Sequence, residues 1–144
     1  MLGLIDHIGV ATRDIDHAIE ILRKTGGIEV GRRGSVSAFQ VEMVMVAAGG
    51  APIELIQPTS PESPVAAFME KRGEGVHHVA YRVDDLEAAL RECRNQGLNL
   101  IDESPREGYG GSRVAFIHPK AMLGILTELV ERPAGCDVPP YDPI

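Results

Sequence analysis

The stretch Asp6-His7-Ile8-Gly9-Val10-Ala11 returns later in the chain as His77-His78-Val79-Ala80-Tyr81-Arg82. A constant shift of 71 residues aligns the two copies without a gap. The alignment extends to three further pairs, which are Asp14 with Asp85, Ala18 with Ala89, and Gly26 with Gly97. A unit repeated at this length indicates two fused supersecondary modules. His7 and His78, at the same point of each module, are therefore expected to meet near a pseudo-twofold axis.

The hydrophobic pattern predicts the same element order in both modules. Alternating apolar residues rich in Ile and Val indicate a strand at 4–11, and apolar residues at helical spacing indicate a helix at 14–25. The other elements of the first module are strands at 28–33, 36–47 and 53–57. The second module has a strand at 76–83, a helix from Asp85 to about Gln96, and strands at 99–103, 113–118 and 125–131.

The chain is thus predicted to be an α+β protein of two tandem βαβββ modules. One domain is expected at residues 1–132, followed by a Pro-rich tail at 133–144 without regular structure. Its parts are module one at 4–58, a connector at 59–74 and module two at 75–132. In the connector, Ser63 suits a helix N-cap, Pro64 the first turn and Gly73 the end.

The composition excludes several classes of function. A net charge of −7 and an aromatic content of 4% argue against nucleic-acid binding, which uses basic surfaces and stacking aromatics. No apolar run approaches the roughly 18–20 residues of a membrane span. The first residues do not resemble a secretory signal, and Cys93 and Cys136 fit reduced thiols, so a cytoplasmic protein is expected.

Each module offers one histidine and one carboxylate in apolar strands. Strand parity places His7 beside the small residue Gly9, which leaves space next to the imidazole. Glu54 and Glu128 lie in the last strands of their modules, and a carboxylate among apolar residues is costly unless it is paired or metal-bound. One such His or Glu is usually structural, but the match across the repeat favours a His2Glu2 site with His78. This donor set suits Co²⁺, Mn²⁺, Ni²⁺ or Zn²⁺.

Glu42 is a further candidate for chemistry. It shares a strand face with Val44 and Val46. A carboxylate among apolar residues has a raised pKa and can exchange protons near neutrality. A carboxylate on a solvated strand face is the alternative, and the residues alone leave both readings open.

Four segments resemble the methylmalonyl-CoA epimerase family, which belongs to the vicinal oxygen chelate superfamily together with glyoxalase I. The segments are 5–11, 53–58, 75–85 and 118–129. The resemblance covers about residues 4–132 and is most specific in the double histidine at 77–78 and in His118-Pro119-Lys120. The first segment alone would indicate only the superfamily. The resemblance implies that the two βαβββ modules form a half-open, curved mixed sheet or barrel.

The resemblance implies four metal ligands, with Co²⁺ favoured over Mn²⁺, Ni²⁺ or Zn²⁺, and these are His7, Glu54, His78 and Glu128. It implies interconversion of (2R)- and (2S)-methylmalonyl-CoA by α-proton transfer through a metal-stabilised enolate. Glu42 and Glu128 would be the acid–base residues, and Glu128 would double as a ligand.

The implied acyl-CoA substrate carries phosphates, so basic residues are expected at the entrance of the site. Lys120 and Arg113 rank first because they flank the segment that leads to Glu128. The family also implies a homodimer. An acyl-CoA epimerase for a related branched substrate stays open.

Rival functions share the expected fold. A glyoxalase I-like lactoylglutathione lyase would use the same metal and the same kind of proton transfer. A non-catalytic small-molecule-binding member of the superfamily would have no need of four metal ligands. A ring-cleaving dioxygenase uses two His and one carboxylate, so a fourth protein ligand argues against it.

Overall fold

The described part of the chain, residues 3–47 and 49–136 of this computed structural model, contains eight strands and three α-helices. The strands are β1 (Ile5–Ala11), β2 (Glu29–Val36), β3 (Val41–Ala47), β4 (Ile53–Pro58), β5 (Gly75–Arg82), β6 (Arg106–Glu107), β7 (Arg113–Ile117) and β8 (Thr127–Glu131). The helices are α1 (Ile15–Arg23), α2 (Pro64–Arg72) and α3 (Leu86–Asn95). Short 3-10 turns are η1 (Ser37–Phe39), η2 (Tyr109–Gly111) and η3 (Pro119–Ala121).

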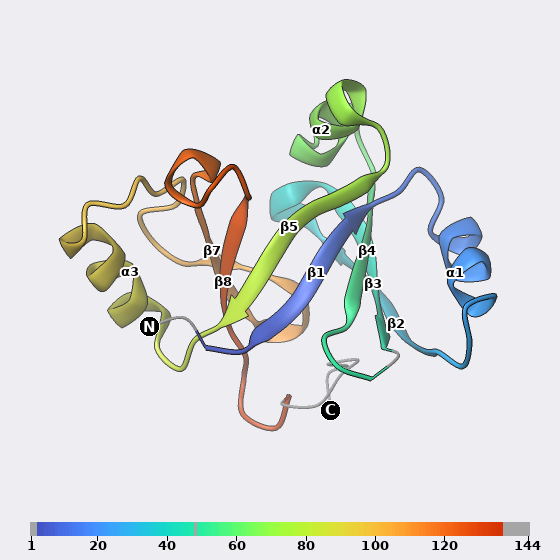
Figure 1. Ribbon diagram of the computed structural model, residues 1–144, viewed down its shortest axis with the longest axis horizontal. Coiled ribbons are helices and arrows are strands. Elements are labelled where there is room, and N and C mark those ends of the chain that lie inside the picture. Colours follow the sequence, from blue (N-terminus) through green and yellow to red (C-terminus); the bar gives the residue numbers. More distant parts are fainter. Residues whose placement is uncertain (1–2, 48, 137–144) are drawn as a thin grey trace.

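All eight strands form one curled mixed sheet in the order β2-β3-β4-β1-β5-β8-β7-β6 (Figure 1). Each module supplies four adjacent strands, and the modules join where β1 and β5 pair antiparallel at the centre. In each half the first strand pairs parallel with the last, β1 with β4 and β5 with β8. This confirms the predicted α+β fold of two βαβββ modules in a half-open curved sheet.

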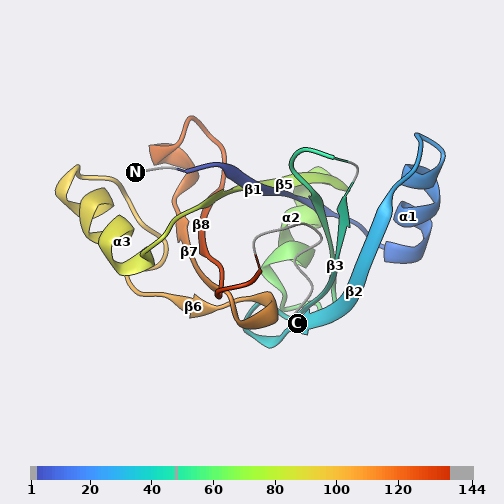
Figure 2. The ribbon, with the colours of Figure 1, turned by 90° about the horizontal axis from the view of Figure 1, so that it is seen from below.

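The helices lie around the arch of the sheet. Figure 2 shows α1 and α3 on opposite flanks, with α2 beneath the central strands. Ile15 and Ile19 of α1 pack on one face of β3 and β4, while Leu86 and Leu90 of α3 pack on β7 and β8. None of the helices in the described residues has the length and apolarity that crossing a membrane requires.

Local capping residues set the ends of the helices as the sequence predicts. The Ser63 hydroxyl accepts a hydrogen bond from the backbone N–H of Val65 at the start of α2, and Gly73 ends that helix. The Asp85 carboxylate accepts from the N–H of Ala88 at the start of α3. These signals are local in sequence, so they can be read without the tertiary structure.

Three predicted strands differ from the structure. The run at 36–47 is broken by η1, because Gln40 adopts a left-handed conformation with φ 51° that ends one strand before the next begins. At 99–103 there is only an isolated bridge between Leu100 and Ile117. The last strand begins at Thr127 rather than 125. Of the predicted tail, residues 137–144 lie outside the described residues, and 133–136 contain no helix or strand.

Two β-bulges interrupt the central pairing of β1 with β5. Ile5 lies opposite Tyr81 and His7 opposite Ala80, so Asp6 is an extra residue in β1. Further along, Gly9 lies opposite His78 and Val10 opposite Val76, so residue 77 is the extra one in β5. The two extra residues are related by the same shift of 71 as the histidines that follow them. A bulge re-aims neighbouring side chains, and here it does so once in each module.

Candidate functional site

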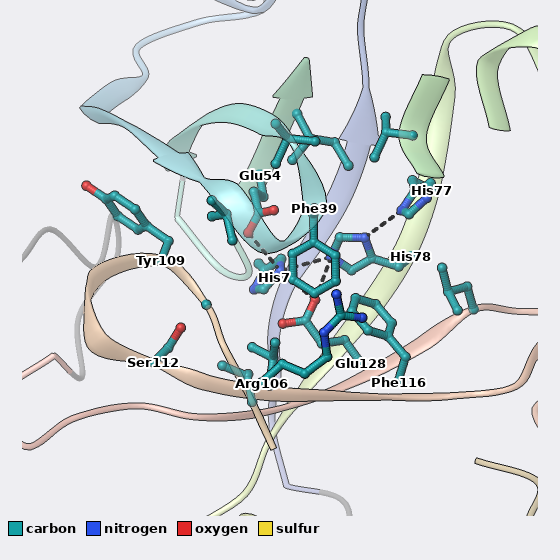
Figure 3. Close-up of a pocket in the computed structure, with 18 of the residues that line it drawn as sticks. His7, Phe39, Glu54, His77, His78, Arg106, Tyr109, Ser112, Phe116 and Glu128 are labelled. Carbon is teal, nitrogen blue, oxygen red and sulfur yellow. Dashed lines mark hydrogen bonds and ion pairs between the residues drawn. The ribbon is translucent and has the colours of Figure 1, made fainter. Parts of the chain in front are cut away.

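Four side chains converge at the junction of the two modules (Figure 3). The Nε2 atom of His7 lies 3.1 Å from Nε2 of His78 and 3.1 Å from a carboxylate oxygen of Glu54. Glu128 completes the group, with one oxygen 3.0 Å from Nε2 of His78 and 3.7 Å from Nε2 of His7. The repeat therefore identifies four residues that the fold brings together.

Small residues on the central strands make room for this cluster. Gly9 pairs with Glu54 on one neighbouring strand and with His78 on the other. A Cβ atom at Gly9 would lie 2.1 Å from Cε1 of His78, so only glycine fits there. Ala80 is the residue equivalent to Gly9 in the repeat and is fully buried. It pairs with His7 on one neighbouring strand and with Glu128 on the other.

The donor set and its spacing fit a divalent metal ion. Ligands bound at about 2.1 Å and at right angles around one ion lie about 3.0 Å apart. Three of the contacts in the cluster, at 3.0, 3.1 and 3.1 Å, have this spacing. His7, Glu54 and His78 each offer an atom within 4.8 Å of the others, which is the reach of one shared ion.

The electrostatics of the cluster also call for a cation. Burial by itself lowers the pKa of His7, but the carboxylates of Glu54 and Asp6 outweigh it and raise that pKa well above its usual range. Burial opposes ionisation of Glu128, yet hydrogen bonds with His7 and His78 hold its pKa below its usual range. Burial also opposes ionisation of Glu54, but the charge of His7 is the main effect that lowers its pKa. The carboxylates stay ionised beside positive charge, which a protonated His7 supplies and a bound cation would supply in its place.

Each of the two histidines makes a second contact through its other ring nitrogen. Nδ1 of His7 lies 2.6 Å from a carboxylate oxygen of Asp6, which is completely buried. Nδ1 of His78 lies 2.9 Å from Nδ1 of His77. Burial and the neighbouring His78 lower the pKa of His77 to about 4, so its ring is neutral at pH 7. The sequence-based predictions give neither partner a role.

A cavity of about 190 Å³ opens over the four side chains. Its walls are mainly apolar and come from both modules, as Phe39, Ile56, Val65 and Phe116 illustrate. Arg106 also lines it, with the guanidinium 4.2 Å from the centre of the Phe39 ring. Such a cavity buries a small organic ligand against a polar floor.

Glu42 lies on the other side of β3 from the cavity. Its neighbour Val41 lines the cavity, and adjacent strand residues point to opposite faces. Val44, which shares the face of Glu42, packs against α1. The Glu42 carboxylate is partly exposed and lies 3.3 Å from the guanidinium of Arg33. The structure does not bring this predicted acid–base residue to the cluster.

The two predicted phosphate-binding residues also lie away from the cluster. Arg113 forms ion pairs with Glu87 of α3 and with Glu131 of β8. Lys120 is exposed in η3. Arg106 and Arg132, which the sequence does not single out, both line the cavity, and Arg106 lies beside Phe39. No local pattern marks Arg106, because its place depends on the contact of β6 with the distant turn η1.

Comparison with known proteins now assigns the family. Residues 6–116 match the Glyoxalase/Bleomycin resistance protein/Dioxygenase superfamily. The chain belongs to this superfamily. An ethylmalonyl-CoA/methylmalonyl-CoA epimerase of Cereibacter sphaeroides is 34% identical over 131 residues, which covers 90% of this chain and 98% of the relative.

Solved structures of this superfamily agree with that relationship. A methylmalonyl-CoA epimerase in complex with methylmalonyl-CoA and NH4⁺ is 37% identical, with a TM-score of 0.87 over 93% of this chain and 97% of that one. A variant of the Streptomyces coelicolor epimerase in complex with 2-nitronate-propionyl-CoA gives a TM-score of 0.88 at 37% identity, covering 93% of this chain and 97% of that one. These relatives are isomerases of the racemase and epimerase class, which confirms the resemblance read from the sequence.

Proposed function

We propose that this chain is a divalent-metal-dependent epimerase that interconverts (2R)- and (2S)-methylmalonyl-CoA. The observation that carries the proposal is the convergence of two imidazoles and two carboxylates at the floor of an apolar cavity. The similarity to epimerases, one of them in complex with methylmalonyl-CoA, supports the choice of substrate.

The proposed metal ligands are His7, Glu54, His78 and Glu128. Co²⁺ is the favoured ion, and Mn²⁺, Ni²⁺ and Zn²⁺ suit the same donor set. A bound ion supplies Lewis acidity, which stabilises negative charge on the oxygens next to the carbon that loses its proton. The remaining steps fall to side chains of this chain.

The proton to be moved lies on the carbon between a thioester and a carboxylate. Glu128 is the proposed acid–base residue inside the cavity, because its carboxylate borders both the cavity and the two imidazoles. The apolar walls exclude water from this carbon, which strengthens the electrostatic contacts and limits loss of the proton to solvent. Arg106 lines the cavity, and its guanidinium is the proposed partner of the anionic acyl group.

Four further assignments are carried by the sequence and its resemblance. Arg113 and Lys120 are predicted to meet the phosphates of CoA outside the cavity. A homodimer and a cytoplasmic location are likewise predictions. Glu42 stays the predicted second acid–base residue, for the face of the carbon opposite to Glu128, and the variants described in the Discussion test both residues.

Proton exchange in heavy water tests the proposal directly. The protein is incubated with (2R)-methylmalonyl-CoA and Co²⁺ in D2O, and we expect deuterium at the α-carbon together with formation of the (2S) epimer. His78→Ala should abolish both, because it removes a ligand. Absence of exchange with Co²⁺ present would overturn the proposal. Turnover of the hemithioacetal of methylglyoxal and glutathione in its place would assign a lyase.

A further inference from the structure

The extra residues of the two β-bulges, Asp6 and His77, are equivalent in the repeat and differ in chemistry. Each precedes a proposed metal ligand, and each contacts the Nδ1 atom of that ligand. A bulge places two consecutive residues where a regular strand places one. It therefore allows a ligand and its neighbour to lie inside the molecule together.

Asp6 is held on several sides. Its side chain is 0% exposed and accepts from Nε and Nη2 of Arg132 at 3.2 and 2.6 Å. Arg82 donates to Oδ2 of this carboxylate through Nε at 3.1 Å and through Nη2 at 2.9 Å. The carboxylate is thus fixed in place by two guanidinium groups, and it also lies 2.6 Å from Nδ1 of His7. A buried anion in this position accepts a hydrogen bond from Nδ1–H, which keeps the proton on Nδ1 and leaves the Nε2 lone pair for the metal.

His77 makes the corresponding contact through an imidazole nitrogen instead of a carboxylate oxygen. Its Nδ1 atom lies 2.9 Å from Nδ1 of His78, so one of the two nitrogens donates and the other accepts. Nε2 of His78 faces the cluster, which requires the proton of that ring to be on Nδ1 when a metal is bound. His77 is then the acceptor. Its own ring is held edge-on against Phe68, with the centroids 4.8 Å apart.

We propose that Asp6 and His77 are a matched pair of positioning residues that fix the orientation and tautomer of His7 and His78. The inference rests on the metal site of the proposed function. The two members are unequal, because a hydrogen bond to a charged acceptor is roughly twice as strong as one to a neutral acceptor. His7 is therefore the more firmly held ligand and the stronger donor. His78 is held by the weaker partner.

Metal titration of two variants tests this pairing. Asp6→Asn keeps the shape but removes the charge, and His77→Phe keeps an aromatic ring beside Phe68 but removes the acceptor. Loss of an outer partner of a metal ligand costs about 10–100-fold in metal affinity. We expect a weakening of Co²⁺ binding near the upper end for Asp6→Asn and near the lower end for His77→Phe. The readouts are the visible absorption of bound Co²⁺ and the affinity from calorimetry.

Matched surface variants give the baseline for these titrations. Asp84→Asn and His17→Phe change the same residue types at exposed positions, and both should bind Co²⁺ like the unchanged protein. Wild-type Co²⁺ affinity in Asp6→Asn or in His77→Phe would overturn the pairing. An affinity loss for His77→Phe larger than that for Asp6→Asn would overturn the proposed order.

A measurement on the unchanged protein covers the case in which Asp6→Asn does not fold. With ¹⁵N-labelled histidine and bound Zn²⁺, long-range proton–nitrogen spectra report which ring nitrogen carries the proton. We expect protonated Nδ1 and metal-bound Nε2 for both His7 and His78. Metal on Nδ1 of either ring would overturn the proposal. A protein that binds Zn²⁺ in this way yet exchanges no α-proton would refute the epimerase and leave the positioning pair intact.

Discussion

Gly9 shows how one residue without a side chain shapes the site. It lies in β1 between the strand positions of Glu54 and His78, and a Cβ atom there would fall 2.1 Å from the His78 ring. Gly9→Ala must therefore push this imidazole out of the cluster. We expect a loss of Co²⁺ affinity of at least roughly tenfold and a destabilisation of about 1–3 kcal/mol from overpacking.

Gly27→Ala is the matched control for that substitution. A Cβ atom at Gly27 would meet no atom within 4 Å beyond its own chain neighbours, and this glycine does not need a positive φ. We expect its metal affinity and denaturation midpoint to equal those of the unchanged protein. Normal Co²⁺ binding in Gly9→Ala, measured by the same titration, would contradict the account of the cluster.

The sequence and its resemblance predict two acid–base glutamates, one for each face of the reacting carbon, and single variants test each of them. Glu128 borders the cavity and both histidines, whereas Glu42 lies on the opposite face of β3 beside Arg33. Glu128→Gln should reduce α-proton exchange by roughly 10²–10⁴-fold, the usual range for loss of a general acid–base residue. Glu42→Gln should leave the rate close to that of the unchanged protein. A large loss in Glu42→Gln with metal still bound would support Glu42 in its predicted role.

At the scale of elements, the start of α2 ties the connector to the cavity wall. The buried Ser63 hydroxyl caps the helix at Val65 and donates 2.8 Å to the carbonyl oxygen of Phe39. Ser63→Ala removes both bonds, and we expect a loss of about 1–2 kcal/mol in the free energy of unfolding. Urea denaturation measures it. Ser104→Ala, at an exposed loop position, should stay within about 0.5 kcal/mol of the unchanged protein.

The elements also show what the sequence can and cannot predict. Caps such as Ser63 and the repeat of the central strands depend on neighbouring residues, so the sequence predicts them correctly. The period of two in β3 predicts that Glu42 and Val44 share a face, but both faces of this strand are apolar. Met43 and Met45 pack on one side and Val44 on the other. Only the tertiary fold decides which side meets the cavity.

The residues of the candidate site can be predicted where they are related by the internal sequence repeat. The shift of 71 picks out His7 and His78, and the near-equivalent glutamates complete a set that does converge. The same shift also pairs Asp6 with His77, a signal that is present in the sequence but needs the bulges to give it meaning. Arg106 has no such signal, because it reaches Phe39 only after β6 folds back beside η1.

For the whole molecule, contacts near both edges of the sheet close one side of the arch. Arg106, in the last module, donates to the carbonyl oxygen of Ala38 at 3.1 Å. Tyr109 donates to that of Arg32 at 3.4 Å and packs where a Cβ on Gly34 would lie. The modules thus meet twice, at the central β1–β5 pair and at this closure. The proposed metal site lies between these two connections and draws ligands from both modules.

A metal held by both modules should stabilise the folded chain as a unit. Ligand binding at about 100 times its Kd adds about 2.7 kcal/mol to the free energy of unfolding. For a chain of this size that corresponds to a rise in Tm of roughly 10 °C. We expect Co²⁺ to give this rise and EDTA to reverse it, as measured by calorimetry. His78→Ala should show no rise, because one module then lacks its histidine.

The shape of the transition gives the same experiment a second criterion. His7 and Glu54 come from module one, and His78 and Glu128 from module two, so the ion binds only when both modules are folded and paired. The unfolding of both modules should therefore shift together, as one cooperative transition at the higher temperature. A rise confined to one of two separate transitions would mean that one module binds the ion alone. An unchanged Tm with saturating Co²⁺ would contradict the proposal that the two modules share a metal site.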